Sequence, residues 1–407
     1  MLPAWGLALA ARVAGRRVER VRLGCNVAVI NSGGSLNRAV QCVGKRLAVQ
    51  AVWRHREGSL MQIIHVSSFP VSPKSKNLHA ISTKLSNGFV RNGHSVINFS
   101  DRDVARAYGF GYRRWGRKRA NYILREICAL HKPQLLLLGH ADVIYAETIA
   151  EIRNDQPDIR IVQWNVDPLF EPDNIRRIES KLDVVDVTLI STAGDLLRRF
   201  KRPGGIVGFM PNPVDFSIER GNVHECEDPP FDLFYPCGNP AKPLRHVFGV
   251  DWNMNDFITT LSDLCPKLNA CLPGIKGAPH LVGALYQAAL EQSAIGLNIS
   301  RRQDFPFYSS DRMAHLAGNG LAVCMEYGSG FEHLFSGREV LFSSTLQELA
   351  DQINELRAYP RLRQEIAAAG RDRYFRLFNE RKVAHYIEEI TFDRLDRSAY
   401  EWPTTPE

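Results

Sequence analysis

Short apolar runs alternate with amphipathic stretches along the chain from Met61 onward. In the first half the runs lie at 62–67, 95–99, 134–139, 159–164 and 185–191. Each run is almost continuously apolar rather than alternating, which is typical of parallel strands covered by helices on both faces. The stretches between them, such as 77–92 and 117–131, have the spacing of amphipathic helices. This order predicts a doubly wound α/β domain that binds its ligands at the carboxyl ends of the strands.

A second series of the same kind follows residues 210–230, which are rich in proline, asparagine and acidic residues. The strands expected there are 232–236, 267–272, 294–299, 321–326 and 339–343. The helices expected there are 241–249, 256–264, 280–292, 311–318 and 345–357, with a closing helical tract at about 360–390. The pattern therefore predicts two Rossmann-like doubly wound domains that face a cleft, where a cofactor-sized ligand binds.

The domain boundaries follow from this pattern. We expect a first domain at 61–215, a linker at 216–230, a second domain at 231–370, and a closing helix and tail at 371–407. Residues 1–60 lack clear periodicity, and we interpret them as a basic leader that is either disordered or a mis-called start. A targeting role for this leader is the alternative.

The net charge of +7 is concentrated in that leader. Residues 1–60 hold nine Arg and one Lys against two Glu, so the other 347 residues carry a net charge of −1. A neutral body does not have the basic footprint of a nucleic-acid-binding protein, so no nucleic-acid partner is expected. No apolar run approaches the roughly 20 residues of a spanning helix. The eight cysteines are scattered, which favours reduced thiols in a cytoplasmic protein.

Three side chains near the ends of first-domain strands are candidates for acid–base chemistry. His140 and Asp142 follow the strand at 134–139, and Asp167 follows the strand at 159–164. Parallel strands place their ligands at such positions, so these residues are predicted to provide acid–base groups to a bound ligand. Helix capping explains the two aspartates equally well.

The stretch SSDRMAHLAGNG at 309–320 is the main candidate for binding a nucleotide diphosphate. Ser310 or Asp311 is expected to cap a helix, and Arg312 would lie in its first turn. A guanidinium beside a helix start offers donors and positive potential to a diphosphate. The positions predicted to bind the donor are Gly238, Arg245, Asn298, Ser309, Ser310, Arg312, His315 and Gly320. The alternative is a structural role, with Arg312 paired to an acid such as Asp304 and His315 in the core.

Three further patterns bear on the chemistry. The chain has no G-x-G-x-x-G fingerprint, so a nicotinamide enzyme is not supported. The triplet DRD at 101–103 has the Asp-x-Asp form that holds a metal in some sugar transferases, but so short a pattern recurs by chance, and we predict no metal ligands and no cofactor beyond the donor substrate. Residues 108–122 interleave basic and aromatic side chains. They are a solvated loop or, alternatively, a peripheral contact with the inner face of a membrane.

Three stretches resemble the two-domain GT-B glycosyltransferases, in particular the group 1 type related to family 4 and to CgeB-like spore-maturation proteins. MPNPVD at 210–215 is similar to the Pro-Asn-Gly-Val-Asp signature that ends the first domain. LYQAALEQSAIGLNISRR at 285–302 resembles the helix–strand unit before the donor loop. DRMAHLAGNG at 311–320, with FEHLFSGREVLFSSTLQELADQI at 331–353, resembles the Arg-x-x-Glu…Gly helix and the segment after it.

The resemblance implies a metal-independent transfer of a sugar from a nucleotide-diphospho-sugar to a glycan or lipid-linked acceptor. It implies that the second domain binds the donor and the first binds the acceptor, which His140, Asp142 or Asp167 would orient or deprotonate if the reaction inverts. It also implies a C-terminal helix that crosses back onto the first domain. In the family's Glu-x7-Glu motif two carboxylates contact the donor, and here Phe307 and His315 stand at those positions. This departure keeps two alternatives open: an impaired GT-B protein that binds without turnover, and a GT-B epimerase or hydrolase of nucleotide sugars.

Overall fold

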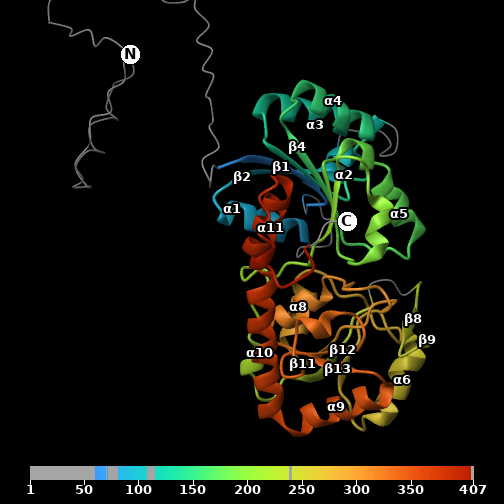
Figure 1. Cartoon of the computed structure of the whole chain (residues 1–407). Helices are drawn as coiled ribbons and strands as arrows, with labels where there is room; N and C mark the ends of the chain where they lie inside the picture. The colour runs from blue at the N-terminus through green and yellow to red at the C-terminus, as the bar shows by residue number, and fades with distance from the viewer. Residues whose placement is uncertain (1–59, 70, 72–80, 108–114, 238–240, 405–407) are drawn as a thin grey trace, which may run out of the picture. The chain divides into compact units, whose positions relative to one another are not determined.

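The computed structural model describes residues 60–69, 71, 81–107, 115–237 and 241–404 (Figure 1). By its internal contacts the chain divides into residues 1–57 and residues 58–407, and the account below concerns the second unit. The interpretation of the leader therefore concerns residues that, apart from Leu60, lie outside the described part. None of the helices in the described part is long and apolar enough to span a membrane.

The first half of this unit is built on a six-stranded parallel sheet in the order β2-β1-β3-β4-β5-β6. Its strands are β1 (Gln62–Ser67), β2 (Ser95–Ser100), β3 (Leu135–Gly139), β4 (Arg160–Asn165), β5 (Val187–Ile190) and β6 (Ile206–Phe209). The sequence predicted the first five and missed β6. That strand is four residues long and contains a glycine, so it lacks the apolar run that marks the others.

Helices connect the strands of this sheet. They are α1 (Ile81–Arg91), α2 (Asp101–Ala107), α3 (Arg117–His131), α4 (Ala146–Asp155) and α5 (Pro172–Glu179). α5 begins with proline at its first position and an aspartate in its first turn, both of which favour a helix start. Because every neighbouring pair of strands is parallel, all their carboxyl ends lie at one edge of the sheet.

The second half has a five-stranded parallel sheet in the order β10-β7-β11-β12-β13. Its strands are β7 (Phe231–Phe234), β10 (Ala270–Cys271), β11 (Ser293–Leu297), β12 (Ala322–Glu326) and β13 (Leu341–Ser343). Its helices are α6 (Met254–Leu264), α7 (Ala284–Glu291), α8 (Arg312–Gly318) and α9 (Leu346–Ala358). The α/β architecture of two doubly wound halves is thus confirmed (Figure 1).

The helix predicted at 241–249 is wrong. The structure has an antiparallel hairpin there, formed by β8 (Leu244–Val247) and β9 (Val250–Asn253). The two residues between the strands, Phe248 and Gly249, have φ angles of 53° and 74°. Positive φ at both positions is the geometry of a tight hairpin turn, and glycine at the second position makes that turn accessible. The turn chemistry therefore outweighs the helical spacing of the apolar residues.

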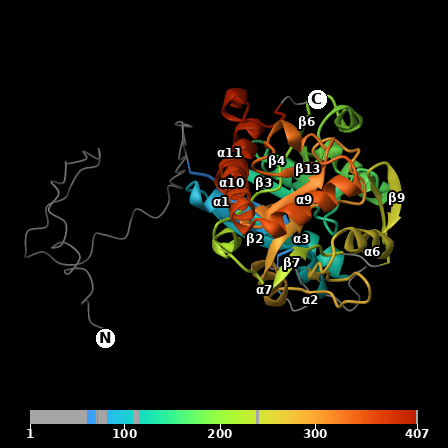
Figure 2. The ribbon, with the colours of Figure 1, turned by 90° about the horizontal axis from the view of Figure 1, so that it is seen from below.

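The closing helical tract predicted at about 360–390 is two helices, α10 (Pro360–Phe378) and α11 (Glu380–Thr391). The break is at Asn379, which has an extended backbone and accepts a hydrogen bond from the Lys382 amide to cap α11. α10 packs on α8 and β12, whereas α11 packs on α1 of the first half. Figures 1 and 2 show this path, and the crossing back of the C-terminal helix is confirmed.

The chain crosses between the two halves twice, and both crossings meet at one place. Val214 donates its amide hydrogen to the Phe378 carbonyl at 2.9 Å and accepts from the Glu380 amide at 2.9 Å. The side chain of Arg91 on α1 pairs with Asp215 at 2.8 Å and with Glu380 at 2.6 Å. These contacts fix the break in the closing helices against the end of the first half.

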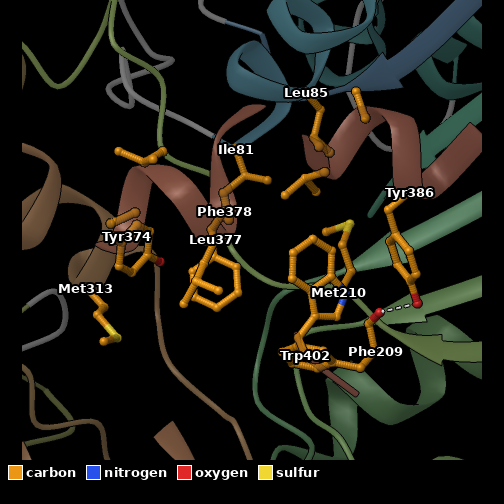
Figure 3. Close-up of a cluster of buried hydrophobic side chains, with 14 of the residues drawn as sticks. Ile81, Leu85, Phe209, Met210, Met313, Tyr374, Leu377, Phe378, Tyr386 and Trp402 are labelled. Carbon is orange, nitrogen blue, oxygen red and sulfur yellow. Dashed lines mark hydrogen bonds between the residues drawn. The ribbon is translucent and has the colours of Figure 1, made fainter. Parts of the chain in front are cut away.

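Large apolar side chains fill the space around this junction (Figure 3). Tyr374, Leu377 and Phe378 of α10 belong to the same buried cluster as Met210, which precedes the crossing. The Tyr386 hydroxyl of α11 donates to the Phe209 carbonyl at 2.9 Å, shown as the dashed line in Figure 3. A single buried cluster therefore includes residues of both halves and of the closing helices.

A buried ion pair lies beside the junction. Lys84 Nζ of α1 is 2.5 Å from Glu219 Oε1, and the two side chains are 0% and 1% exposed. The second carboxylate oxygen of Glu219 accepts from the Asp215 amide at 2.8 Å. Burial raises the pKa of Glu219 and Lys84 opposes that rise, and because the two charged atoms are in contact we treat the pair as ionised.

We expect Lys84→Met to lower the free energy of unfolding by about 3–5 kcal/mol, because it leaves the Glu219 carboxylate buried without its counter-charge. The double variant Lys84→Met/Glu219→Gln should recover much of this loss, since glutamine can still accept from the Asp215 amide. Urea denaturation followed by circular dichroism measures both variants. A loss below about 1 kcal/mol in the single variant would contradict this role of the pair.

Candidate functional site

A pocket of about 340 Å³ lies between the two halves of the described unit. The first half contributes residues that follow β1, β3 and β4, and the second half contributes residues that precede α8. They include Ser67, Ser68, His140, Ala141, Val166, Asp167, Tyr308, Ser310 and Asp311. The structure thus brings three of the predicted site residues, His140, Asp167 and Ser310, into one pocket at the carboxyl ends of parallel strands.

The backbone turns sharply where β3 enters the pocket. His140 and Ala141 have φ angles of 59° and 44°, a left-handed conformation that is unfavourable for side chains with a Cβ. Gly139 precedes them, and a Cβ at that position would lie 2.1 Å from the ring of Trp164. Only glycine lets β3 end so close to this ring. The turn places the His140 side chain in the pocket.

The protonation state of His140 follows from its neighbours. Its Nδ1 is 3.1 Å from Arg177 Nη1 and 3.4 Å from Asn165 Nδ2, and both of these groups can only donate. Nδ1 therefore accepts, and a neutral ring carries its proton on Nε2. Burial lowers the pKa of His140, while Asp167, whose Oδ2 is 3.6 Å from Nδ1, opposes this shift. His140 thus offers an N–H donor rather than a base.

The two predicted aspartates have different surroundings. Asp142 is paired with Arg102 and, at 2.9 Å, with Arg177. Burial opposes ionisation of Asp142, but the two guanidinium groups outweigh it and lower the pKa of its carboxyl below the ordinary value. Asp167 accepts from Arg177 at 2.7 Å, and its side chain is 48% exposed. Asp167 is therefore the more accessible of the two carboxylates to a ligand in the pocket.

Several residues that support this pocket were missed by the sequence analysis. The Trp164 indole donates from Nε1 to His65 Nε2 at 3.1 Å. His65 Nδ1 is 2.8 Å from the Ser86 hydroxyl, which donates to Asn98 Oδ1 at 2.7 Å. Because Nε2 accepts, the neutral ring donates from Nδ1 to the Ser86 hydroxyl. Each residue in the series from Trp164 to Asn98 therefore donates a hydrogen bond to the next. These four residues are far apart in the sequence, so no local pattern marks them.

The loop before α8 is fixed by residues from both halves. Asn212, in the MPNPVD stretch, donates from Nδ2 to the Ser309 carbonyl at 2.7 Å. Asn298 donates from Nδ2 to the Ser309 hydroxyl at 3.3 Å, and that hydroxyl donates to the Ser310 carbonyl at 2.8 Å. Tyr374 donates to the Asn212 carbonyl at 3.0 Å. Asn212 was missed as a site residue, although the motif that contains it was recognised.

Arg312 and Arg245 both bond backbone carbonyls. Arg312 donates from Nη1 to the Ile299 carbonyl at 2.7 Å, and its guanidinium is 5.4 Å from the centre of the Tyr235 ring. It therefore does not pair with Asp304, which is bound by Arg302. Arg245 is buried in β8 rather than near a following helix, and it donates to the carbonyls of Lys242 and Leu244 at 2.8 and 2.9 Å.

The remaining predicted donor-binding positions differ in their surroundings. His315 is mostly buried, with Nδ1 3.4 Å from the Tyr286 hydroxyl and Nε2 3.6 Å from Asp311. Gly320, two residues after the end of α8, has a φ of 81°, and a Cβ there would lie 2.5 Å from the His224 ring. The Asp311 side chain makes no capping hydrogen bond to α8. Gly238 lies outside the described residues.

Phe307, at the other position of the expected carboxylates, is part of an aromatic cluster. Its ring centre is 5.7 Å from that of Phe209 and 5.7 Å from that of Phe331. Its φ of 55° is strained, and its amide donates to the Ser329 carbonyl at 2.7 Å. Phe307 therefore packs the two halves together, and it offers no polar contact to a sugar.

The triplet DRD begins α2, and both of its carboxylates have protein partners. Asp101 accepts from the Val143 amide at 3.3 Å, and Asp103 pairs with Arg106 at 2.7 Å. Among the described residues no group of three or more His, Cys, Asp or Glu side chains is placed to hold a metal ion. The aromatic residues of the segment 108–122 that are described, Trp115 and Tyr122, are exposed, and 108–114 lie outside the described residues.

Comparisons with known proteins identify the fold. Residues 241–389 match the family model described as glycosyl transferase-like. No curated protein matches the chain. Among solved structures, sucrose-phosphate synthase from Thermosynechococcus elongatus is similar over 82% of this chain and 98% of that chain, with 11% identity and a TM-score of 0.55.

Two further solved structures are similar in the same way. The HepE protein of Anabaena in complex with UDP and glucose covers 82% of this chain and 100% of its own, with 12% identity and a TM-score of 0.51. A glycosyltransferase from Rickettsia africae covers 83% and 100%, with 10% identity and a TM-score of 0.52. With two doubly wound halves and a returning C-terminal helix, these likenesses show that the chain has the GT-B fold.

The buried His65 below the pocket predicts a pH dependence of stability. Burial lowers its pKa from 6.5 to about 3. As the pH falls below 6.5, His65 therefore becomes protonated in the unfolded chain but stays neutral in the folded chain. The contribution of His65 is complete above pH 6.5 and is lost as the pH falls towards 3. At pH 5 this loss is about 2 kcal/mol.

The variant His65→Gln keeps an acceptor for the Trp164 indole but does not titrate. We expect its free energy of unfolding to fall less steeply than that of the wild type between pH 7 and pH 5, by about 2 kcal/mol over this range. Urea denaturation at four pH values measures both slopes. Equal slopes would show that His65 is not held neutral.

Proposed function

We propose that the protein is a glycosyltransferase that moves a sugar from a nucleotide-diphospho-sugar to a glycan or lipid-linked acceptor without a metal ion. The observation that carries this proposal is a pocket formed by residues of both halves within a GT-B fold. The match of residues 241–389 to a glycosyl transferase-like family, and the likeness to a protein that binds UDP and glucose, support it. We place the reaction in the cytoplasm, at the inner face of a membrane.

The second half would bind the donor. Within the described residues, the Ser310 hydroxyl and the Asn298 amide oxygen are buried without a hydrogen-bond partner, and Ser310 lines the pocket. Buried polar atoms are normally satisfied, so we propose that the Ser310 hydroxyl bonds a ligand in the pocket and that Asn298 lies behind it. Arg312 would stabilise the diphosphate electrostatically as it leaves. Gly238, Arg245, Ser309, His315 and Gly320 complete the proposed donor-binding positions.

The first half would bind the acceptor and complete the chemistry. His140 would donate its Nε2–H to an oxygen of the reacting sugar or acceptor, and it would strengthen this bond as charge develops. Asp167, which is accessible in the pocket, would take the acceptor proton if the anomeric centre is inverted. Asp142 does not line this pocket, and we propose that it positions Arg177, which in turn fixes His140 and Asp167.

A lipid-linked acceptor would be reached from a membrane surface. Trp115 and Tyr122, at the start of α3, are exposed, and Arg119 lies 4.9 Å from the centre of the Tyr122 ring. Exposed aromatic rings beside basic side chains favour the interface of an anionic membrane. We therefore propose this part of the segment 108–122 as the peripheral membrane contact.

A second candidate is a GT-B protein that binds a nucleotide sugar without transferring it. The specific observation in its favour is that Phe307 and His315 stand where the resembled family has carboxylates. Phe307 packs against Phe209 and Phe331, and His315 is mostly buried beside Tyr286. This candidate predicts nucleotide binding with no turnover.

The test combines binding with turnover. Titration calorimetry with UDP, GDP and ADP identifies the base, and release of the nucleoside diphosphate from the matching nucleotide sugar measures turnover. We expect His140→Ala to lower kcat by about 10²–10³-fold, because alanine removes the N–H donor to developing charge, with nucleotide affinity within two-fold of the wild type. His131→Ala, on the exposed end of α3, is the matched control and should change neither quantity.

The outcomes separate the candidates. Turnover that depends on His140 supports the transferase. Binding without turnover by the wild type favours the binding protein, and no binding of any nucleotide contradicts both. A kcat for His140→Ala within two-fold of the wild type would contradict the role given to this residue.

A further inference from the structure

We propose that a second pocket beside the first binds a phosphate group of the acceptor. This inference rests on the proposed function, because it names a chemical feature of the molecule that receives the sugar. The pocket has a volume of about 460 Å³ and lies in the first half of the unit. Its lining includes Arg117, Arg177, Lys181 and the start of α4.

The surroundings of Lys181 are the main evidence for this anion site. Its side chain lines the pocket and the residue is only 4% exposed, yet within the described residues its ammonium group has no hydrogen bond and no ion pair. A charged group on a mostly buried side chain is costly without a counter-charge, and because Lys181 lines the pocket, an anion bound there can pair with it. Burial lowers the pKa of Lys181. The charges of Asp142 and Asp101 oppose this shift, whereas those of Arg117 and Arg177 add to it.

Arg117 lies on another wall of the pocket and is held in place by two contacts. It donates from Nε to the Val143 carbonyl at 3.0 Å, and its guanidinium is 4.3 Å from the centre of the Tyr145 ring. Within the described residues, neither contact uses the terminal N–H groups of the guanidinium, which can therefore bind a ligand. A planar, pre-oriented guanidinium is suited to bind phosphate oxygens.

The start of α4 adds backbone donors to the same pocket. Ala146 and Glu147, its first two residues, line the pocket, and Tyr145 at the cap position provides no capping side chain. The first amides of a helix have no partner within the helix and favour an anion. This feature would not define a site alone, but here it coincides with Lys181 and Arg117.

The carboxylates near the pocket do not cancel its positive charge. Asp142 lines the pocket and acts on Lys181, but it is also bound by Arg102 and Arg177, whose two charges exceed its own. Glu147 is exposed to solvent, which screens its charge. Lys181 and Arg117 therefore remain as two cations for an anionic ligand, which favours a phosphate over a neutral hydroxyl group.

The two pockets are connected through one set of charges. Arg177 lines the second pocket and bonds Asp167 and His140 of the first at 2.7 and 3.1 Å. A phosphate held by Lys181 and Arg117 would thus anchor an acceptor whose hydroxyl lies beside His140. Arg117 belongs to the basic and aromatic segment 108–122. This residue of the segment would therefore bind the phosphate of the acceptor.

The experiment measures phosphate binding to the full chain. Inorganic phosphate is titrated by calorimetry with and without saturating UDP, so that binding at a nucleotide site is blocked. We expect saturable binding that UDP does not abolish, and a Kd at least ten-fold weaker in Lys181→Met and in Arg117→Gln. Lys118→Gln removes an equal charge from the exposed neighbour of Arg117 and should bind like the wild type.

Two organic probes identify the source of the phosphate. Glucose 6-phosphate tests a soluble sugar phosphate, and a short-chain polyprenyl phosphate in detergent tests a lipid-linked acceptor. The inference is supported if either probe binds and its affinity is ten-fold lower in Lys181→Met. The probe with the higher affinity identifies the source of the phosphate. The thermal midpoint of Lys181→Met is the folding control and should not fall, since the variant removes a buried charge.

Failure of this inference is distinguishable from failure of the proposed function. UDP binding with no phosphate binding, or with phosphate binding that Lys181→Met and Arg117→Gln leave unchanged, overturns the second pocket and leaves the transferase intact. Phosphate binding that depends on Lys181 without binding of any nucleotide upholds the pocket as an anion site and overturns the transferase.

Discussion

The pairing of Val214 with the backbone on either side of Asn379 is the constraint on which the two-half arrangement depends. It joins the segment that leaves the first half to the break between α10 and α11, so both crossings of the chain are fixed at one point. Arg91, Asp215 and Glu380 surround it with charge, and the buried pair Lys84–Glu219 lies beside it. Because isolated charges at such depth would be costly, the junction is stable only when every partner is in place.

The pocket between the halves follows from this junction. Asn212 lies two residues before Val214 and holds the Ser309 carbonyl of the donor-side loop. The position of that loop is therefore coupled directly to the crossing point. On the other side, the short turn after β3 presents His140, and Arg177 fixes its tautomer and the orientation of Asp167. The chemistry proposed for the pocket uses groups whose positions are set by the fold rather than by a ligand.

The sequence predicts the α/β architecture better than it predicts the short strands and the contacts between side chains. Continuous apolar runs marked five strands of the first sheet, but β6 was too short and the β8–β9 hairpin was hidden by helical spacing. Strand ends placed His140 and Asp167 in a common pocket, because parallel strands share one edge. The roles of Arg177, His65 and Lys181 could not be predicted, since each depends on contacts between residues distant in the sequence or on the depth at which a charge is buried.

The proposed position of the donor between the two halves can be measured most directly by a crystal structure with a bound nucleotide sugar. Crystals grown with UDP-glucose, or with the nucleotide sugar whose base binds best, should show the sugar between Ser310 and His140 and the diphosphate near Arg312. Nucleotide density elsewhere on the protein, or an empty pocket at a concentration that saturates binding in solution, would contradict the assignment of this pocket as the site of transfer.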